Sequence, residues 1–177
     1  NSCKKLAALL STAADSTKDA LAQDKKEVET FLNNVANSVV KDGSAYSAIK
    51  MAVPADYFKQ TEDEFSAYTK TLDPSDEAYG MTFEQFIDAL LSAQIKSITN
   101  SVQSIKISVA DLSDCKSKLT ADQKQMYASC GDIAKAYIAK IKSDVTFKPG
   151  ADTSGYNTDD LGKITVVNAG GNWYIAG

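Results

Sequence analysis

Period-two alternation of apolar and polar side chains in the last third of the chain constrains the fold most. Over residues 133–148 the two kinds of side chain separate by parity. The apolar parity holds Ile133, Tyr137, Ala139, Ile141, Val145 and Phe147, and the polar parity holds Lys140, Lys142, Asp144, Thr146 and Lys148. Successive side chains of a strand point to opposite faces of a sheet, so this pattern predicts a long strand with one buried and one solvated face.

A second apolar run follows this strand and predicts a hairpin. Residues 164–167 are joined to residues 173–175 by a short polar segment that contains Gly170 and Gly171. Glycine supplies the positive φ angles that a tight hairpin turn needs. The C-terminal third is therefore expected to form a curved antiparallel sheet.

Helical periodicity dominates the chain before residue 101. Apolar side chains recur at three- and four-residue steps over residues 28–39, behind Asp24 and Glu27, which have the spacing of a capping box. We expect a helix to begin at Asp24. A short helix is expected on each side of Pro54, because proline restricts the residue before it to extended conformations.

Two further capping boxes place the remaining helices. Thr82 and Gln85 open a helix whose wide apolar face should lie on the sheet, and Thr120 and Gln123 open a short one. Alternation over residues 105–109 predicts the first strand. The short helix is therefore inserted between the first two strands.

Helices first and an antiparallel sheet last indicate an α+β fold, with the N-terminal helices packed on a curved, cone-like C-terminal sheet. The chain has 177 residues, a length that suits one domain. We assign that domain to residues 24–177. Residues 1–23 form either a tether or a loosely docked helix.

Composition excludes several classes of site. The chain contains no histidine and no arginine, so it lacks the usual general base near neutral pH, the commonest metal ligand and the bidentate anion clamp. The net charge is −4 and the lysines are scattered, which argues against a nucleic-acid partner. Neither a metal site nor a cofactor motif is predicted.

The three cysteines suggest two roles. Cys115 and Cys130 bracket a short segment, and a disulfide between them would stabilise the fold by about 3 kcal/mol in an oxidising compartment. The alternative is a pair of reduced, buried thiols. Asn-Ser-Cys-Lys-Lys, around Cys3, resembles a bacterial lipoprotein cleavage site, although Asn1 and Ser2 would be absent from a mature lipoprotein. The resemblance implies lipid attachment at Cys3 and an extracytoplasmic, membrane-anchored or secreted protein.

The order of elements, and the ending Gly-Lys-Ile-Thr-Val-Val-Asn-Ala-Gly-Gly-Asn-Trp-Tyr-Ile at residues 162–175, resembles the nuclear transport factor 2-like, or cystatin-like, cone. More narrowly, the chain is similar to small secreted lipoproteins of Gram-positive bacteria that carry such a domain. The resemblance implies a cell-surface protein whose sheet wraps around a helix. It also implies a cavity at the open end of the sheet.

Aromatic side chains are the candidates for lining that cavity. Tyr46, Tyr57, Tyr137 and Trp173 are the candidate ligand-binding residues, although large aromatic side chains also pack protein cores. A carboxylate close to a tyrosine hydroxyl would suit proton transfer, and the candidates for such a pair are Tyr137 with Asp56 or with another carboxylate.

These patterns favour a non-enzymatic, lipid-anchored, extracytoplasmic domain. We expect it to bind a small apolar ligand or a protein partner through the open end of its sheet. One alternative is an isomerase or dehydratase that uses a pocket carboxylate and a tyrosine. Another is a helical adhesion or scaffold module with a small C-terminal hairpin.

Overall fold

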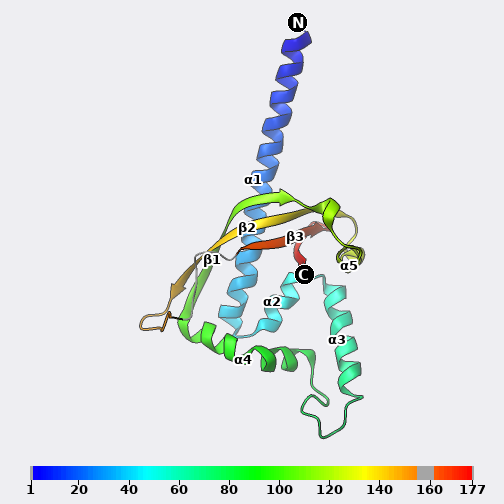
Figure 1. Ribbon diagram of the computed structural model, residues 1–177, viewed down its shortest axis with the longest axis vertical. Helices are drawn as coiled ribbons and strands as arrows, with labels where there is room; N and C mark the ends of the chain where they lie inside the picture. Colours follow the sequence, from blue (N-terminus) through cyan, green and yellow to red (C-terminus); the bar gives the residue numbers. More distant parts are fainter. Residues whose placement is uncertain (1, 155–161, 177) are drawn as a thin grey trace.

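The computed structural model describes residues 2–154 and 162–176, and the side chains of residues 11–154 and 162–176. It is an α+β fold with the helices first and an antiparallel sheet last, as predicted (Figure 1). The longer helices are α1 (Ser2–Asp42), α2 (Ala45–Ala52), α3 (Ala55–Thr69) and α4 (Phe83–Ser101). The strands are β1 (Val102–Asp114), β2 (Ile133–Phe147), β3 (Lys163–Ala169) and β4 (Asn172–Ala176).

Between β1 and β2 the chain forms the short helix α5 (Ala121–Met126), flanked by the 3-10 turns η1 (Lys116–Lys118) and η2 (Ala128–Cys130). Both capping boxes expected from the sequence are present, at Thr82 with Gln85 and at Thr120 with Gln123. In each, the threonine oxygen accepts the backbone N–H three residues on, and the glutamine side chain accepts the threonine N–H.

The sheet has the order β1-β2-β3-β4, and every neighbouring pair is antiparallel. Gly170 and Gly171 join β3 to β4 with φ angles of +57° and +83°, as the predicted hairpin requires. Strands β1 and β2 are 13 and 15 residues long, so the alternative of a helical bundle with one small hairpin is wrong.

The sheet is covered on both faces. On one face α1 packs against all four strands through a cluster of Val28, Leu32, Ile107, Val109, Leu112, Ala139, Ile141, Val166 and Trp173. On the other face the segment between β1 and β2 covers a second cluster of Cys115, Leu119, Tyr127, Ala136, Val167 and Ala169. The expected alternation therefore holds from Ala139 onward, whereas Ala136 is also buried because α5 and its flanking turns lie over it.

Helices α2, α3 and α4 form a separate layer below the sheet (Figure 1). Ile87 and Ile95 of α4 are buried with Ala45 of α2, and α4 packs against both α1 and α2 and not chiefly on the sheet as expected. The reason is that α1 already covers that part of the sheet. Edge-to-face ring contacts, such as Phe58 with Phe83 at 5.8 Å, tie α3 to α4.

The first helix does not begin at Asp24. α1 is continuous from Ser2 to Asp42, and Asp24 is 3% exposed within it. Its carboxylate accepts hydrogen bonds from Lys135 Nζ at 2.5 Å and from the Tyr137 hydroxyl at 2.7 Å. The Asp-x-x-Glu spacing that predicted a cap belongs instead to a helix interior, where the acid reaches partners on the sheet.

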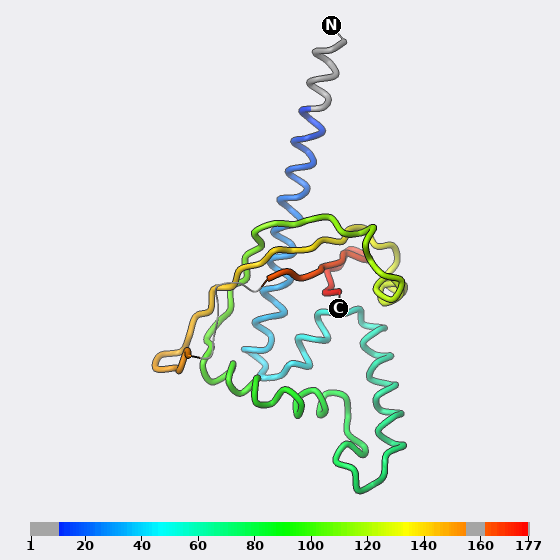
Figure 2. Tube along the Cα trace, viewed as in Figure 1, coloured from blue at the N-terminus to red at the C-terminus, as the bar shows by residue number. Residues whose placement is uncertain are grey.

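Residues 11–23 of α1, here called the stem, lead away from the sheet (Figure 2), and the stem borders β1 at Lys18, Leu21 and Ala22. Every side chain of the stem is exposed. Among the described residues, no helix combines the length and the apolar character needed to cross a bilayer.

Polar side chains of α1 bond the outer edge of β1. Asn33 Nδ2 donates to the Ile107 carbonyl at 2.8 Å while its Oδ1 accepts the Ile107 N–H at 2.7 Å. Asn37 makes the same pair of bonds to Ile105, and Glu29 accepts the Val109 N–H. We call Glu29, Asn33 and Asn37 the amide ladder. Four residues of helix rise about 6 Å and two residues of strand about 6.8 Å, so the two spacings match closely enough for all three residues of the ladder to reach the strand.

Candidate functional site: a cleft beside the last strand

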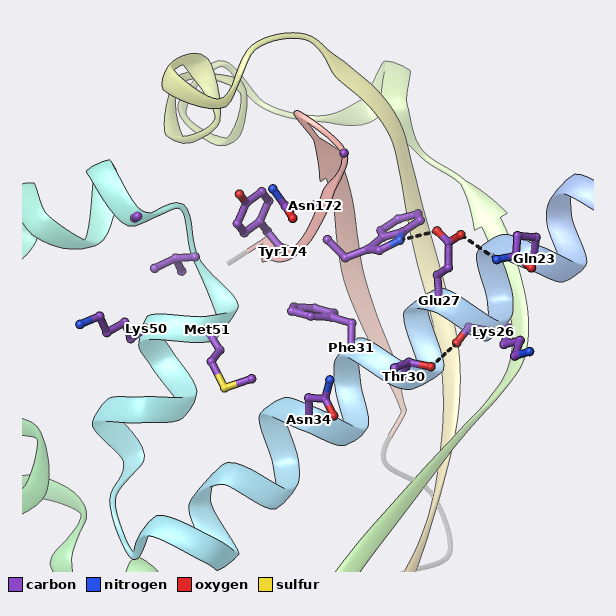
Figure 3. Close-up of a pocket in the computed structure, with 14 residues that line it drawn as sticks. Gln23, Lys26, Glu27, Thr30, Phe31, Asn34, Lys50, Met51, Asn172 and Tyr174 are labelled. Carbon is purple, nitrogen blue, oxygen red and sulfur yellow. Dashed lines mark hydrogen bonds between the residues drawn. The ribbon is translucent and has the colours of Figure 1, made fainter.

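A cleft of about 700 Å³ lies between α1, the end of α2 and the β3–β4 hairpin (Figure 3). This volume is in the usual range for small-molecule sites. Its lining is Gln23, Lys26, Glu27, Thr30, Phe31, Asn34, Lys50, Met51, Val53, Ala55, Gly171, Asn172, Trp173 and Tyr174. Apolar and aromatic side chains thus meet amides and charged groups from three separate segments.

Trp173 and Glu27 form the wall of the cleft on the α1 side. The indole Nε1 donates to Glu27 Oε2 at 3.1 Å, and Gln23 Nε2 donates to the other carboxylate oxygen at 2.9 Å. These two hydrogen bonds, the one from Gln23 first, lower the pKa of Glu27 below its ordinary value. The Glu27 carboxylate is therefore ionised near neutral pH and already has two donors.

Behind Trp173 lies a second acid–aromatic contact. The Tyr137 ring stacks on Trp173 with centroids 6.0 Å apart, and the Tyr137 hydroxyl donates to Asp24. Burial, followed by the bond to Asp24, raises the pKa of Tyr137. Lys135 forms an ion pair with the same carboxylate. Asp24 and Tyr137 do not line the cleft, so this group joins α1 to the sheet.

The predicted ligand-binding residues separate in space. Trp173 lines the cleft, and Tyr137 supports it from behind. Tyr46 packs with Phe58 among the helices, and its hydroxyl donates to Glu62, a bond that raises the pKa of Tyr46 to about 12.

The candidates from the start of α3 lie elsewhere. Tyr57 is 40% exposed and borders a different depression, next to Met126 of α5. Asp56 is exposed in the first turn of α3. The expected pairing of Asp56 with Tyr137 is wrong, because the carboxylate that meets Tyr137 is that of Asp24.

Several residues of the site have no distinguishing signal in the sequence. Phe31 has the spacing of a core position of its helix, yet it is half-buried and points into the cleft opposite Met51 (Figure 3). The sequence does indicate that Asp24 is buried. It stands four residues before Val28 and eight before Leu32, on the helix face that packs against the sheet. An acid on a buried helix face needs a partner.

The cysteines are not bonded to one another. Cys115 and Cys130 are both free, so they do not form the disulfide suggested by their spacing; the alternative of two buried thiols describes Cys115, whereas Cys130 is half-buried. Cys115 is buried, and burial raises the pKa of its thiol. The Cys130 thiol instead donates to the Tyr174 hydroxyl at 3.7 Å, so the two sulfurs lie in different environments. The side chain of Cys3 lies outside the described residues.

No family model, no curated protein and no solved structure matches this chain. The described residues contain no cluster of three or more acids or cysteines that could hold a metal ion. The function is therefore inferred from the residues of the cleft and from their chemistry.

Proposed function

We propose that this protein is a binding domain whose cleft takes an apolar group, contributed by a small ligand or by a protein partner. The observation that supports this proposal is the convergence of Phe31, Met51 and Tyr174, from three separate elements, on one cleft. Met51 is 42% exposed at the cleft surface. Covering such a side chain with an apolar group is favourable at about 25 cal/mol per Å².

Binding accounts for the polar groups better than catalysis does. The carboxylate and hydroxyl that converge, in Asp24 and Tyr137, are bonded to each other and to Lys135, outside the cleft lining. Glu27 does line the cleft, but its two donors and lowered pKa make it a poor proton donor near neutral pH. These contacts favour the binding role over an isomerase or dehydratase.

The proposal includes an extracytoplasmic, lipid-anchored location at a Gram-positive cell surface, with attachment at Cys3. The exposed stem supports this location. Residues 11–23 form a helix about 20 Å long, which would separate the sheet from the membrane surface by about that length. A cone-like domain of the nuclear transport factor 2-like kind is part of the same proposal. The α+β order and the sheet packed around α1 support it.

Trp173 is the single tryptophan of the chain, so intrinsic fluorescence reports on the cleft. We would titrate the protein with anilinonaphthalene sulfonate, a fluorescent aromatic anion, and follow energy transfer from Trp173. Saturable transfer is expected, and Met51→Gln should weaken binding by about tenfold, because it replaces an apolar side chain of the cleft by an amide without adding a charge that would attract the anionic probe. Leu90→Gln is the matched control, since Leu90 is 62% exposed on α4 and lies outside the cleft. Equal binding by both variants would contradict the proposal.

A further inference from the structure

We infer that the apolar group is a side chain of an extended peptide, contributed by a partner protein, that adds to the free edge of β4. This inference rests on the proposed function and identifies the class of occupant. An added strand gains affinity from main-chain hydrogen bonds and specificity from alternate side chains.

The hairpin geometry leaves backbone groups on this edge. The two-residue turn pairs Ala169 with Asn172 by hydrogen bonds, so Trp173 and Ile175 direct their N–H and C=O groups away from β3. The Ile175 carbonyl accepts the Tyr127 hydroxyl at 3.1 Å. Within residues 2–154 and 162–176, no partner is found for the N–H and C=O of Trp173 or for the N–H of Ile175.

The cleft runs along this edge of the strand. Trp173 and Tyr174 are consecutive, so their side chains point to opposite faces of the sheet. Both nevertheless line the cleft, which a cavity confined to one face would not allow. The opposite wall is the end of α2 and the start of α3, through Met51 and Ala55. A peptide between these walls would have β4 on one side and helix on the other.

The two edges of the sheet are treated differently. On β1, the amide ladder satisfies the outward N–H and C=O groups of Ile105 and Ile107 and the N–H of Val109. On β4, the Tyr127 hydroxyl bonds the Ile175 carbonyl, and the outward N–H and C=O groups of Trp173 face the cleft. Proteins usually cover or disrupt an edge that is not meant to pair. The edge of β4 at Trp173, which borders the cleft, is therefore suited to a partner.

The charged side chains of the cleft indicate which residues the peptide should contain. Lys26 and Lys50 stand at opposite ends of the cleft (Figure 3), and neither forms an ion pair with a described acid, although the Lys50 ammonium also lies 5.8 Å from the centroid of the Tyr46 ring. The cleft carboxylate, Glu27, is occupied by Trp173 and Gln23. The complementary peptide has a central apolar residue, which seats near the exposed Met51, and acidic residues toward its ends.

The test begins with a random-peptide display library selected on the full chain, with elution by anilinonaphthalene sulfonate. An enriched peptide is then synthesised with single backbone N-methyl groups at each position, and its affinity is measured by Trp173 fluorescence. N-methylation should weaken binding by about tenfold or more at the one residue whose N–H meets the Trp173 carbonyl, and leave the other residues within about twofold, because the Ile175 carbonyl already accepts the Tyr127 hydroxyl. The double variant K26E/K50E should weaken binding by about tenfold, and Leu90→Lys should not.

Three results would overturn the inference. These are the absence of any enriched peptide, an N-methyl scan in which no single position is sensitive, and a peptide that binds K26E/K50E as well as the native chain. If anilinonaphthalene sulfonate still binds in a Met51-dependent manner, the strand-addition inference fails while the proposed function stands. If both probes fail to bind, both proposals fail.

Discussion

Replacing Asn33 with alanine tests whether the amide ladder stabilises the fold. The side chain makes two hydrogen bonds to the backbone of Ile107, at 2.7 and 2.8 Å. Ile107 is 9% exposed. The truncation of Asn33 therefore leaves one N–H and one C=O of a buried residue without their partners.

The expected cost is set by these two groups. A buried polar group without a partner costs about 1–3 kcal/mol, and the lower end applies here because Asn33 is only half-buried and water can replace part of its side chain. The two groups together cost about 2 kcal/mol. Alanine also improves the helix propensity by about 0.5 kcal/mol, so the net loss should be about 1.5 kcal/mol.

Asn34→Ala is the matched control, because Asn34 is the next residue of the same helix and is exposed. It gains the same helix propensity and loses no contact with β1, so it should be stabilised by about 0.5 kcal/mol. Urea unfolding followed by circular dichroism measures both variants. A difference in the free energy of unfolding of less than about 0.5 kcal/mol between Asn33→Ala and Asn34→Ala would refute the reasoning. It would mean that water hydrogen-bonds the N–H and C=O of Ile107 as favourably as the Asn33 amide does.

Three further predictions concern the sheet and its hairpin. Tyr137→Phe should lower the free energy of unfolding by about 1–3 kcal/mol in urea titrations, because the buried carboxylate of α1 loses a hydrogen bond. Because the pKa of Glu27 is lowered in the folded state, the hydrogen bond from Trp173 to the Glu27 carboxylate stabilises the fold above pH 4.5 and is lost as the pH falls through the folded-state pKa of Glu27. Tryptophan emission should change over this acidic pH range, and Glu27→Gln should abolish the change. Gly170→Ala should cost about 1 kcal/mol more than Gly171→Ala in thermal unfolding, because both have positive φ but a Cβ at Gly170 would stand 2.3 Å from the carbonyl oxygen of Cys130 in η2. Equal costs would contradict this contact between the hairpin turn and η2.

Features with local causes could be predicted from the sequence. The cap at Thr82 depends on a residue three positions away, and the hairpin turn depends on Gly170 and Gly171 themselves. The alternation in β2 is also local, because each side chain takes its face from the strand geometry. These predictions are confirmed.

Features with distant causes could not be predicted. Asp24 has the local spacing of a helix cap, but its real partners, Lys135 and Tyr137, are more than a hundred residues away in the chain. The cleft has the same origin, since α1, α2 and the hairpin contribute to it from three distant segments. Tyr46 and Tyr57 sit on helices whose exposed faces are decided by packing with other helices, and the sequence of each helix alone does not contain that information.

The amide ladder also determines which changes of length the chain can accept. One residue inserted between Glu29 and Asn33 would turn everything on its far side by about 100° around the helix axis, and Asn33 and Asn37 would leave the edge of β1 together. An insertion in residues 11–17 of the stem would lengthen and rotate an exposed helix ahead of Lys18, the first stem residue that borders β1. In related chains, the stem should therefore vary in length, while the distance from Asp24 to Asn37 should stay constant.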